Sequence, residues 1–434
     1  MKIRTLSFAF ALLAIMTALI SCADKNPTPT GKPQSLMHPT DEYNYMLTPK
    51  YWNEQAADIA GMAQNTEAKI DLNATINKGG YGEPKIAGQT DGEKILLTGT
   101  YPVLKDKKDY SSIFSKLPNS KVGFSGRIPP DKLIAYVKLP GLQGIFDTVH
   151  DYYQLLIDKG ETKSKSNPVT QLTGLLMMAR VDIQEDVFSW MGPEIGLIMY
   201  KATDRDKEEY LNTAFVMSIK DKAKAQEKLA MLLKLAGGFE GQKPDKEWLK
   251  RETYKSYDMD LLDTTGVDLS RLGIPPDQGK SGENLPGGIL YTDDYLFISD
   301  TYGLKQLADI YNPGGAPGDV STMAAYIDWD ALMKYSTRYQ NDEVKKIRKQ
   351  FEGKPENLAK FEENYNKFVK MSQGKTYGKS KVLVNVAQDG LKIDMETTKS
   401  VVELMNFINE WFKESMKTEE KPIETSKKKE EAKG

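Results

Sequence analysis

The chain has very little of the side-chain chemistry that most enzyme active sites use. Its 434 residues include one cysteine, Cys22, and two histidines, His38 and His150. One cysteine cannot form a disulfide within the chain, and two histidines leave little for multi-histidine metal sites or catalytic triads. Packing alone must therefore stabilise the fold, and any catalysis would depend on carboxylates. We predict no metal, no cofactor and no catalytic residue.

Long apolar runs and an excess of one charge are also absent. The most extended apolar run, residues 6–20, has 15 residues, fewer than the ~20 that a membrane-spanning helix needs. Lys2 and Arg4 precede it, which is typical of a cleaved secretion signal. Without residues 1–21, the chain has 57 basic residues (59 less Lys2 and Arg4) against 61 acidic ones, a net charge of −4. This balance argues against a nucleic-acid-binding protein.

The end of the apolar run has the pattern of a lipid attachment site. Leu19-Ile20-Ser21-Cys22 matches a lipobox at all four positions, and the chain here resembles bacterial lipoproteins. The resemblance implies a signal peptide at residues 1–21, a thioether-linked diacylglycerol on Cys22 and a further acyl chain such as palmitate. Two or three acyl chains anchor a protein stably where one does not. With Ala23 next, we expect the outer membrane of a diderm host, on its periplasmic or surface face.

Composition divides the mature chain into a tether, a body and a tail. Residues 22–50 contain five prolines, a spacing that forbids a helix and predicts an extended tether after the lipidated cysteine. Residues 417–434 alternate short blocks of lysine and glutamate, which predicts a disordered tail. Between them we expect an N-terminal α/β segment (51–127), a first hairpin-helix module (128–320) and a second module with a helical hairpin (321–416).

The body repeats the order strand, strand, helix. The three predicted units have hairpins at 195–201 with 212–219, at 288–291 with 295–299, and at 381–388 with 391–397 through an Asp389-Gly390 turn. Residues 133–138 also resemble residues 323–328, which favours a duplicated module without settling it. Residues 78–92 are glycine-rich and predicted to be a loop. The sequence thus predicts an α+β fold with antiparallel sheets built from these units and with helices on one face.

The most distinctive segment of the chain is 181–194, which is rich in carboxylates. Asp182 is predicted to cap a helical turn with Glu185 as its capping-box partner, and a left-handed Gly192 would end that turn. The alternative is catalytic, because paired carboxylates hydrolyse glycosides when burial keeps one of them protonated. The candidates for that chemistry are Asp182, Glu185, Asp186 and Glu194.

This segment also carries a family resemblance. The pattern Asp186-x-x-x-Trp190-x-Gly192-x-Glu194, with Pro130-Asp131 and the Asp389-Gly390 hairpin, resembles the bacterial family called domain of unknown function 3352. The likeness covers residues 128–412. It implies an exported or membrane-tethered protein without an established activity. We interpret the segment residues Asp182, Asp186, Trp190, Gly192 and Glu194 as structural.

Taken together, these features favour a non-catalytic binding or interaction module anchored to the cell envelope. One alternative is a carboxylate-dependent hydrolase of envelope glycans. Another is a carrier of an apolar ligand, because Met177, Met178, Met191, Met199 and Met217 cluster in the sequence. The expected partners are the membrane, through lipid on Cys22, and envelope proteins, glycan or lipid; nucleic acid is not expected.

Overall fold

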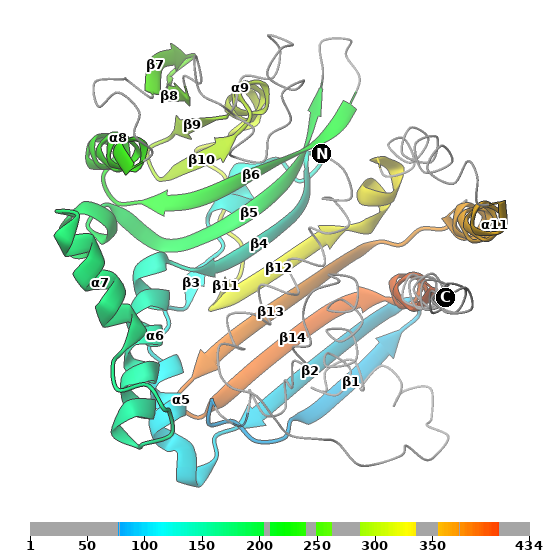
Figure 1. Ribbon diagram of the computed structural model, residues 1–434. Helices are drawn as coiled ribbons and strands as arrows, with labels where there is room; N and C mark the ends of the chain where they lie inside the picture. Colours follow the sequence, from blue (N-terminus) through cyan, green and yellow to red (C-terminus); the bar gives the residue numbers. More distant parts are fainter. Residues whose placement is uncertain are drawn as a thin grey trace, which may run out of the picture.

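The body of the protein is built on one twelve-stranded antiparallel sheet (Figure 1). The computed structural model describes residues 77, 79–203, 209–239, 249–262, 287–335, 355–372 and 374–407. The predicted signal peptide, lipobox, tether and charged tail lie outside these residues. No helix in the described part of the chain is long and apolar enough to cross a membrane.

The strands follow the order β1-β2-β14-β13-β12-β4-β5-β6-β10-β9-β8-β7 across the sheet. Their bounds, in that order, are Lys85–Asp91, Lys94–Pro102, Gly390–Thr398, Lys379–Ala387, Met323–Asp328, Leu133–Pro140, Met191–Thr203, Glu209–Ile219, Tyr295–Ser299, Gly288–Tyr291, Tyr257–Leu262 and Leu249–Tyr254. A small second sheet pairs β3 (Ser120–Lys121) with β11 (Val320–Ser321).

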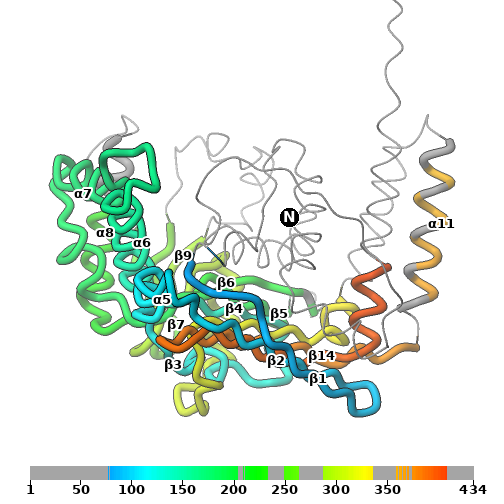
Figure 2. The backbone as a smooth tube through the Cα atoms, turned by 90° about the horizontal axis from the view of Figure 1, so that it is seen from below, coloured from blue at the N-terminus to red at the C-terminus, as the bar shows by residue number. Residues whose placement is uncertain are grey.

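Most of the described helices lie on one side of the large sheet, which we call the helical face. Figure 2 shows α6, α7 and α8 at one end of the sheet and α11 at the other end, on the same side. Their bounds are Leu142–Asp158 for α6, Pro168–Met178 for α7, Lys222–Phe239 for α8 and Pro355–Ser372 for α11; residues 329–335 and 399–407 are also helical. Helix α9 (Thr301–Ile310) packs on the opposite face, and α5 (Lys108–Phe114) contacts α6.

The predicted α+β class with an antiparallel sheet is confirmed, whereas the repeated strand–strand–helix unit stays a prediction. The hairpins β5-β6, β9-β10 and β13-β14 form, and each leads into a helix. Strands β4 and β12 pair side by side, with Tyr136 opposite Tyr326 and their rings stacked at 5.5 Å. Outward from this pair, β4-β5-β6 and β12-β13-β14 have the same order. A duplicated module would produce this arrangement, and the duplication itself stays a prediction.

Two local predictions are wrong. Residues 78–92 are not all loop, because β1 pairs there with β2 along its whole length. The last hairpin turns at Gln388 and Asp389, since Ala387 already lies opposite Gly390. Glycine is needed at position 390 because a Cβ there would lie 2.8 Å from the Tyr101 carbonyl oxygen. Helix α8 continues through Gly237-Gly238, although glycine disfavours the helix interior.

Candidate functional site

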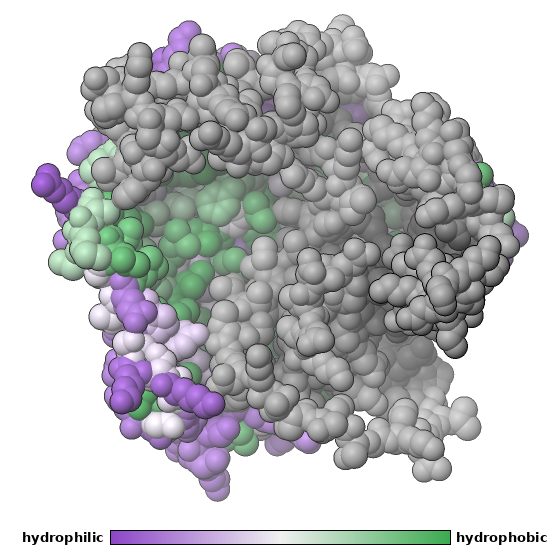
Figure 3. Space-filling view, in the orientation of Figure 1, coloured by the Kyte–Doolittle hydropathy of each residue, from purple (hydrophilic) through white to green (hydrophobic). Residues whose placement is uncertain are grey.

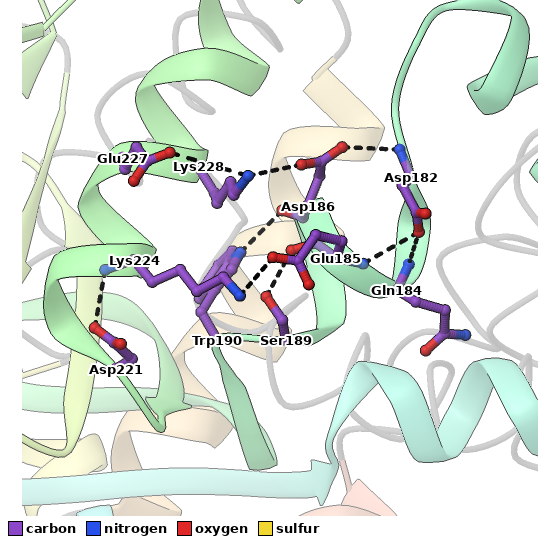
Figure 4. Close-up of polar contacts among 10 residues, drawn as sticks. All are labelled: Asp182, Gln184, Glu185, Asp186, Ser189, Trp190, Asp221, Lys224, Glu227 and Lys228. Carbon is purple, nitrogen blue, oxygen red and sulfur yellow. Dashed lines mark hydrogen bonds and ion pairs between the residues drawn. The ribbon is translucent and has the colours of Figure 1, made fainter.

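The carboxylate-rich segment forms a capped helical turn beside α8 (Figure 4). The side chain of Asp182 accepts hydrogen bonds from the backbone N–H groups of Gln184 (2.9 Å) and Glu185 (3.1 Å), as predicted for a cap. The predicted capping-box partner is wrong: Asp186, and not Glu185, accepts the hydrogen bond from the N–H of Asp182, at 2.8 Å. Residues Ile183–Phe188 form a π-helix. A π-turn contains one more residue than an α-turn, so residue 186, and not residue 185, lies beside the cap.

The other acids of this segment are paired with lysines of α8. Glu185 binds Lys224 and Asp186 binds Lys228, each with a nitrogen–oxygen distance of 2.8 Å. Residues four apart lie on the same side of a helix, so both lysines face the segment. The hydrogen bond from Lys228, with that from the backbone of Asp182, holds the pKa of Asp186 below its usual range. Asp186 is therefore an ionised partner in a salt bridge, which does not suit proton transfer near neutral pH.

Trp190 belongs to the core and is not exposed as a platform for sugars. Its side chain is fully buried, and its indole N–H donates to the carbonyl oxygen of Asp186 at 3.0 Å. It packs with Phe188, Met191 and Ile219. The tryptophan thus fixes the π-turn against the sheet, in agreement with a structural reading of the motif.

Gly192 does not end the turn in a left-handed conformation as predicted. It lies in β5 without a positive φ, and a Cβ there would come within 2.3 Å of the Ser218 hydroxyl oxygen. The pairing of β5 with β6 is irregular between Met191 and Ile195. In this irregular stretch the carbonyl of Pro193 accepts from the N–H of Gly141 at 2.7 Å. Close approach of the backbone to β6 explains the glycine.

Glu194 lies on the other face of the sheet, away from the acids that α8 binds. Its side chain is buried, the residue being 3% exposed, and accepts hydrogen bonds from the Tyr295 hydroxyl (2.6 Å) and the backbone N–H of Gly123 (3.3 Å). Burial raises the pKa of Glu194, although these hydrogen bonds and Lys138 oppose the shift. The four candidate carboxylates therefore do not converge on one accessible site. This geometry does not support a glycosidase pair.

Lys138 is a buried cation near Glu194 that the sequence reasoning missed. Its ammonium group donates to the backbone carbonyls of Ser321, of Thr322 (3.1 Å) and of Ser120 (3.3 Å). Burial lowers the pKa of Lys138 to about 8, and the Glu194 carboxylate opposes this shift. The available signal was a lysine inside the apolar strand β4, where an unpaired charge is costly. Among the described residues, no group of three or more metal-binding side chains is placed to hold an ion.

A row of apolar side chains crosses the helical face of the sheet, and we call it the central row. Each residue lies directly opposite the next on the neighbouring strand. The row consists of Leu97, Met395, Val382, Ala325, Val137, Leu197, Phe215, Ile298 and Ile289. Leu97 and Ile289 at its ends and Val137 in its middle are buried, whereas Leu197 and Phe215 are half-buried and Ile298 is 40% exposed. Side chains in register on adjacent strands touch, so the row is a continuous apolar strip.

Helices cover the sheet on both sides of the central row. On one side, Ile195 and Met217 are buried in a cluster with side chains of α6 and α8. On the other side, Met199 is buried in a cluster with residues of the helical segments 329–335 and 399–407. Figure 3 shows the result from the helical face: hydrophobic side chains gather in a hollow beside α6 and α7.

The reverse face of the same strands is polar at the β1-β2-β14 end. Thr98 donates to Asp394 at 2.7 Å, and Lys94 pairs with Glu396 at 3.2 Å. Alternation along β2 and β14 thus separates a hydrated face from an apolar one. The apolar face is the candidate functional site.

Comparisons with known proteins add no relative. No family model, no curated protein and no solved structure matches the chain. The resemblance to domain of unknown function 3352 stays a prediction from the motif residues.

Proposed function

We propose that this protein is a lipid-anchored component of the bacterial cell envelope that binds an elongated apolar ligand on the central row, without catalysis. The observation that carries the proposal is the continuity of that row. From Met395 on β14 to Ile298 on β10 it crosses seven strands, which is roughly 29 Å at about 4.8 Å between strands. A surface of this length and composition suits an acyl chain or a similar apolar molecule.

The electrostatics of the acidic segment favour binding over hydrolysis. Asp182 caps a helix, Glu185 and Asp186 are paired with lysines, and Glu194 is buried on the opposite face. Ligand sites are typically apolar with few polar groups, as the central row is. A methionine in the row, Met395, adds an adaptable side chain.

Replacing two residues at the middle of the row should abolish most ligand binding. The double variant Leu197→Asn/Phe215→Asn removes apolar contact at two half-buried positions, each worth about 1.5 kcal/mol or roughly ten-fold in affinity. We therefore expect a roughly 100-fold weaker affinity for the fluorescent apolar probe N-phenyl-1-naphthylamine, and for palmitate that displaces it. Titration of probe fluorescence measures both.

The matched control is Thr100→Asn/Lys392→Asn, two exposed positions on the polar face of β2 and β14. This control should bind the probe as the wild type does. Wild-type affinity in the Leu197/Phe215 variant would show that the ligand site lies elsewhere. Equal weakening in both variants would also contradict the proposal.

The lipid anchor has its own test. In protein extracted from membranes of its host, the N-terminal peptide should begin at Cys22 and carry diacylglycerol and an acyl chain by mass spectrometry. Cys22→Ser should carry neither, whereas Ser21→Ala, which keeps a small residue in the lipobox, should be modified as the wild type is. An unmodified Cys22 thiol that reacts with an alkylating reagent would contradict lipidation.

A further inference from the structure

Helix α7 presents an unusual surface for a protein so rich in charge. Its eleven residues include no charged side chain, although charged residues make up 28% of the chain, a share that would give about three in eleven. Leu172, Leu175, Met177 and Met178 are 48%, 60%, 65% and 76% exposed. They are four of the six large hydrophobic side chains that are exposed in the described residues. Exposed apolar clusters of this kind mark interaction surfaces.

The other side of α7 is held firmly against the body. Asn167 accepts from the N–H of Val169 at 3.0 Å and donates to the carbonyl of His150 on α6 at 2.9 Å. Val169 is buried, and Leu176 packs on the cluster beneath α6. The apolar outer surface therefore belongs to a fixed helix with capped ends.

At the C-terminal end of α7, Arg180 occupies the left-handed position that is usually glycine. The N–H of Val181 donates to the carbonyl of Leu176 (2.8 Å) and that of Arg180 to Met177 (2.9 Å), the bonds of a Schellman motif. Arg180 has a φ of 61°, a left-handed conformation that favours glycine or asparagine. An arginine is thus kept beside Met177 and Met178 in a position that disfavours it.

Further cations precede the helix. Lys163 and Lys165 are exposed, and together with Arg180 they form no ion pair within the described part of the chain. Between Lys159 and Arg180, Glu161 is the one acidic residue of the sequence. An uncharged apolar helix thus has unpaired basic residues at both ends. Lipid bilayers with anionic headgroups complement this pattern, because apolar side chains insert while lysine and arginine reach the phosphates.

We infer that α7 is an interfacial helix that docks the body onto a bilayer surface rich in anionic phospholipid. A second copy of the chain fits the same surface less well, because a two-fold interface would bring Lys163, Lys165 and Arg180 of both copies together. The predicted tether also favours a membrane, since residues 23–50 reach at most about 100 Å from a lipidated Cys22. That last step rests on the proposed lipid anchor.

Docking through α7 would also orient the candidate site. Helix α7 lies at the edge of the molecule and borders the apolar hollow (Figures 1 and 3). The hollow would then open close to the lipid surface, where an apolar ligand could enter it without crossing much water.

A single introduced cysteine tests the docking directly. A lipid-modified Cys22 has no free thiol, so Met178→Cys in the full lipidated chain carries the one reactive thiol and takes an NBD fluorophore there. In phosphatidylcholine vesicles that contain phosphatidylglycerol, we expect a blue shift of NBD emission and quenching by lipid brominated near the headgroup. The matched control is Asp91→Cys, an exposed site at the end of β1 on the other side of the molecule, which should show neither.

Variants of α7 separate the two parts of the interaction. Leu172→Asp/Leu175→Asp at exposed positions should fold normally by circular dichroism and lose the blue shift, whereas Leu175→Met should keep it. Loss of three cations in Lys163→Gln/Lys165→Gln/Arg180→Gln should weaken docking by about five-fold each, roughly 100-fold together. Equal emission at positions 178 and 91 in these vesicles would overturn the inference. A blue shift of NBD emission that occurs without vesicles and accompanies self-association in solution would also overturn the inference.

Failure of the anchor and failure of the docking are distinguishable. If Cys22 of the wild-type chain reacts with the fluorophore, the lipid anchor is wrong, and the same NBD measurement at position 178 is then made in a Cys22→Ser background. A blue shift there supports docking without the anchor. No shift there overturns docking as well.

Discussion

Replacing Trp190 with alanine is expected to lower the free energy of unfolding by about 3–5 kcal/mol. The indole is fully buried and is the largest side chain of its cluster. Alanine would leave a cavity between the π-turn and the sheet, since the strands around it cannot close the gap. The carbonyl of Asp186 would also lose the indole N–H that it accepts at 3.0 Å. Urea denaturation followed by circular dichroism measures the change.

Two comparisons make the Trp190 result informative. Trp190→Phe keeps most of the ring volume and should cost about 1–2 kcal/mol, mainly through the lost hydrogen bond. Leu175→Ala on the exposed side of α7 should change stability by less than about 0.5 kcal/mol. If Trp190 instead served as a platform for sugars, its replacement would leave stability almost unchanged and would impair glycan binding.

The local pattern of this sequence predicted much of the fold. The pattern of residues 195–201 and 212–219 predicted the β5-β6 hairpin. The cap at Asp182 was also predictable, because a short acceptor before an apolar turn has few other uses. These features depend on neighbours within a few residues.

Features that depend on distant pairing could not be predicted. The sheet joins the two predicted modules because β4 pairs with β12, and the N-terminal strands β1 and β2 extend it beside β14. The central row emerges only when all these registers are known, since a shift of one residue in any strand would turn its side chain to the other face. Leu197 and Val382, for example, gave no sign in sequence that they lie in one row, three strands apart, with Ala325 and Val137 between them.

The acidic segment shows a different limit of sequence reasoning. Glu194 follows Asp186 by eight residues and looked like part of the same cluster, yet β5 turns it to the face where Tyr295 and Gly123 bind it. The irregular stretch at Gly192 and Pro193 sets that direction. A bulge is decided by the fit of two strands and has only weak local signals.

Lys138 should make the protein more stable as the pH rises from about 8 to about 10.5. Burial lowers the pKa of its ammonium group from 10.5 to about 8 in the folded protein, while the unfolded chain keeps the ordinary value. Below pH 8 both states carry the proton, and the folded state bears the full cost of a buried charge. Between the two values the folded state has lost the proton and the unfolded state has not, so stability rises with pH. The difference of about 2.5 pH units corresponds to at most about 3 kcal/mol.

The measurement is urea denaturation of the wild type and of Lys138→Met across this pH range. Between pH 8 and pH 10.5, the free energy of unfolding of the wild type should rise by up to about 3 kcal/mol relative to that of Lys138→Met. Lys121→Met, on the exposed position of β3, is the control and should follow the wild type, because water hydrates that ammonium group in both states. A constant difference between wild type and Lys138→Met would contradict a depressed pKa at this site.

Glu194 provides a second variant if Lys138→Met does not fold. The carboxylate of Glu194 opposes the shift of Lys138, so Glu194→Gln should lower the pKa of Lys138 further and move the rise in stability to lower pH. Glu194 itself acts in the opposite sense, because its folded pKa is raised and its contribution to stability falls as the pH rises through that value. In Glu194→Gln, this loss of stability with rising pH should be absent. Relative to Glu194→Gln, the wild type should therefore lose stability as the pH rises through the folded pKa of Glu194.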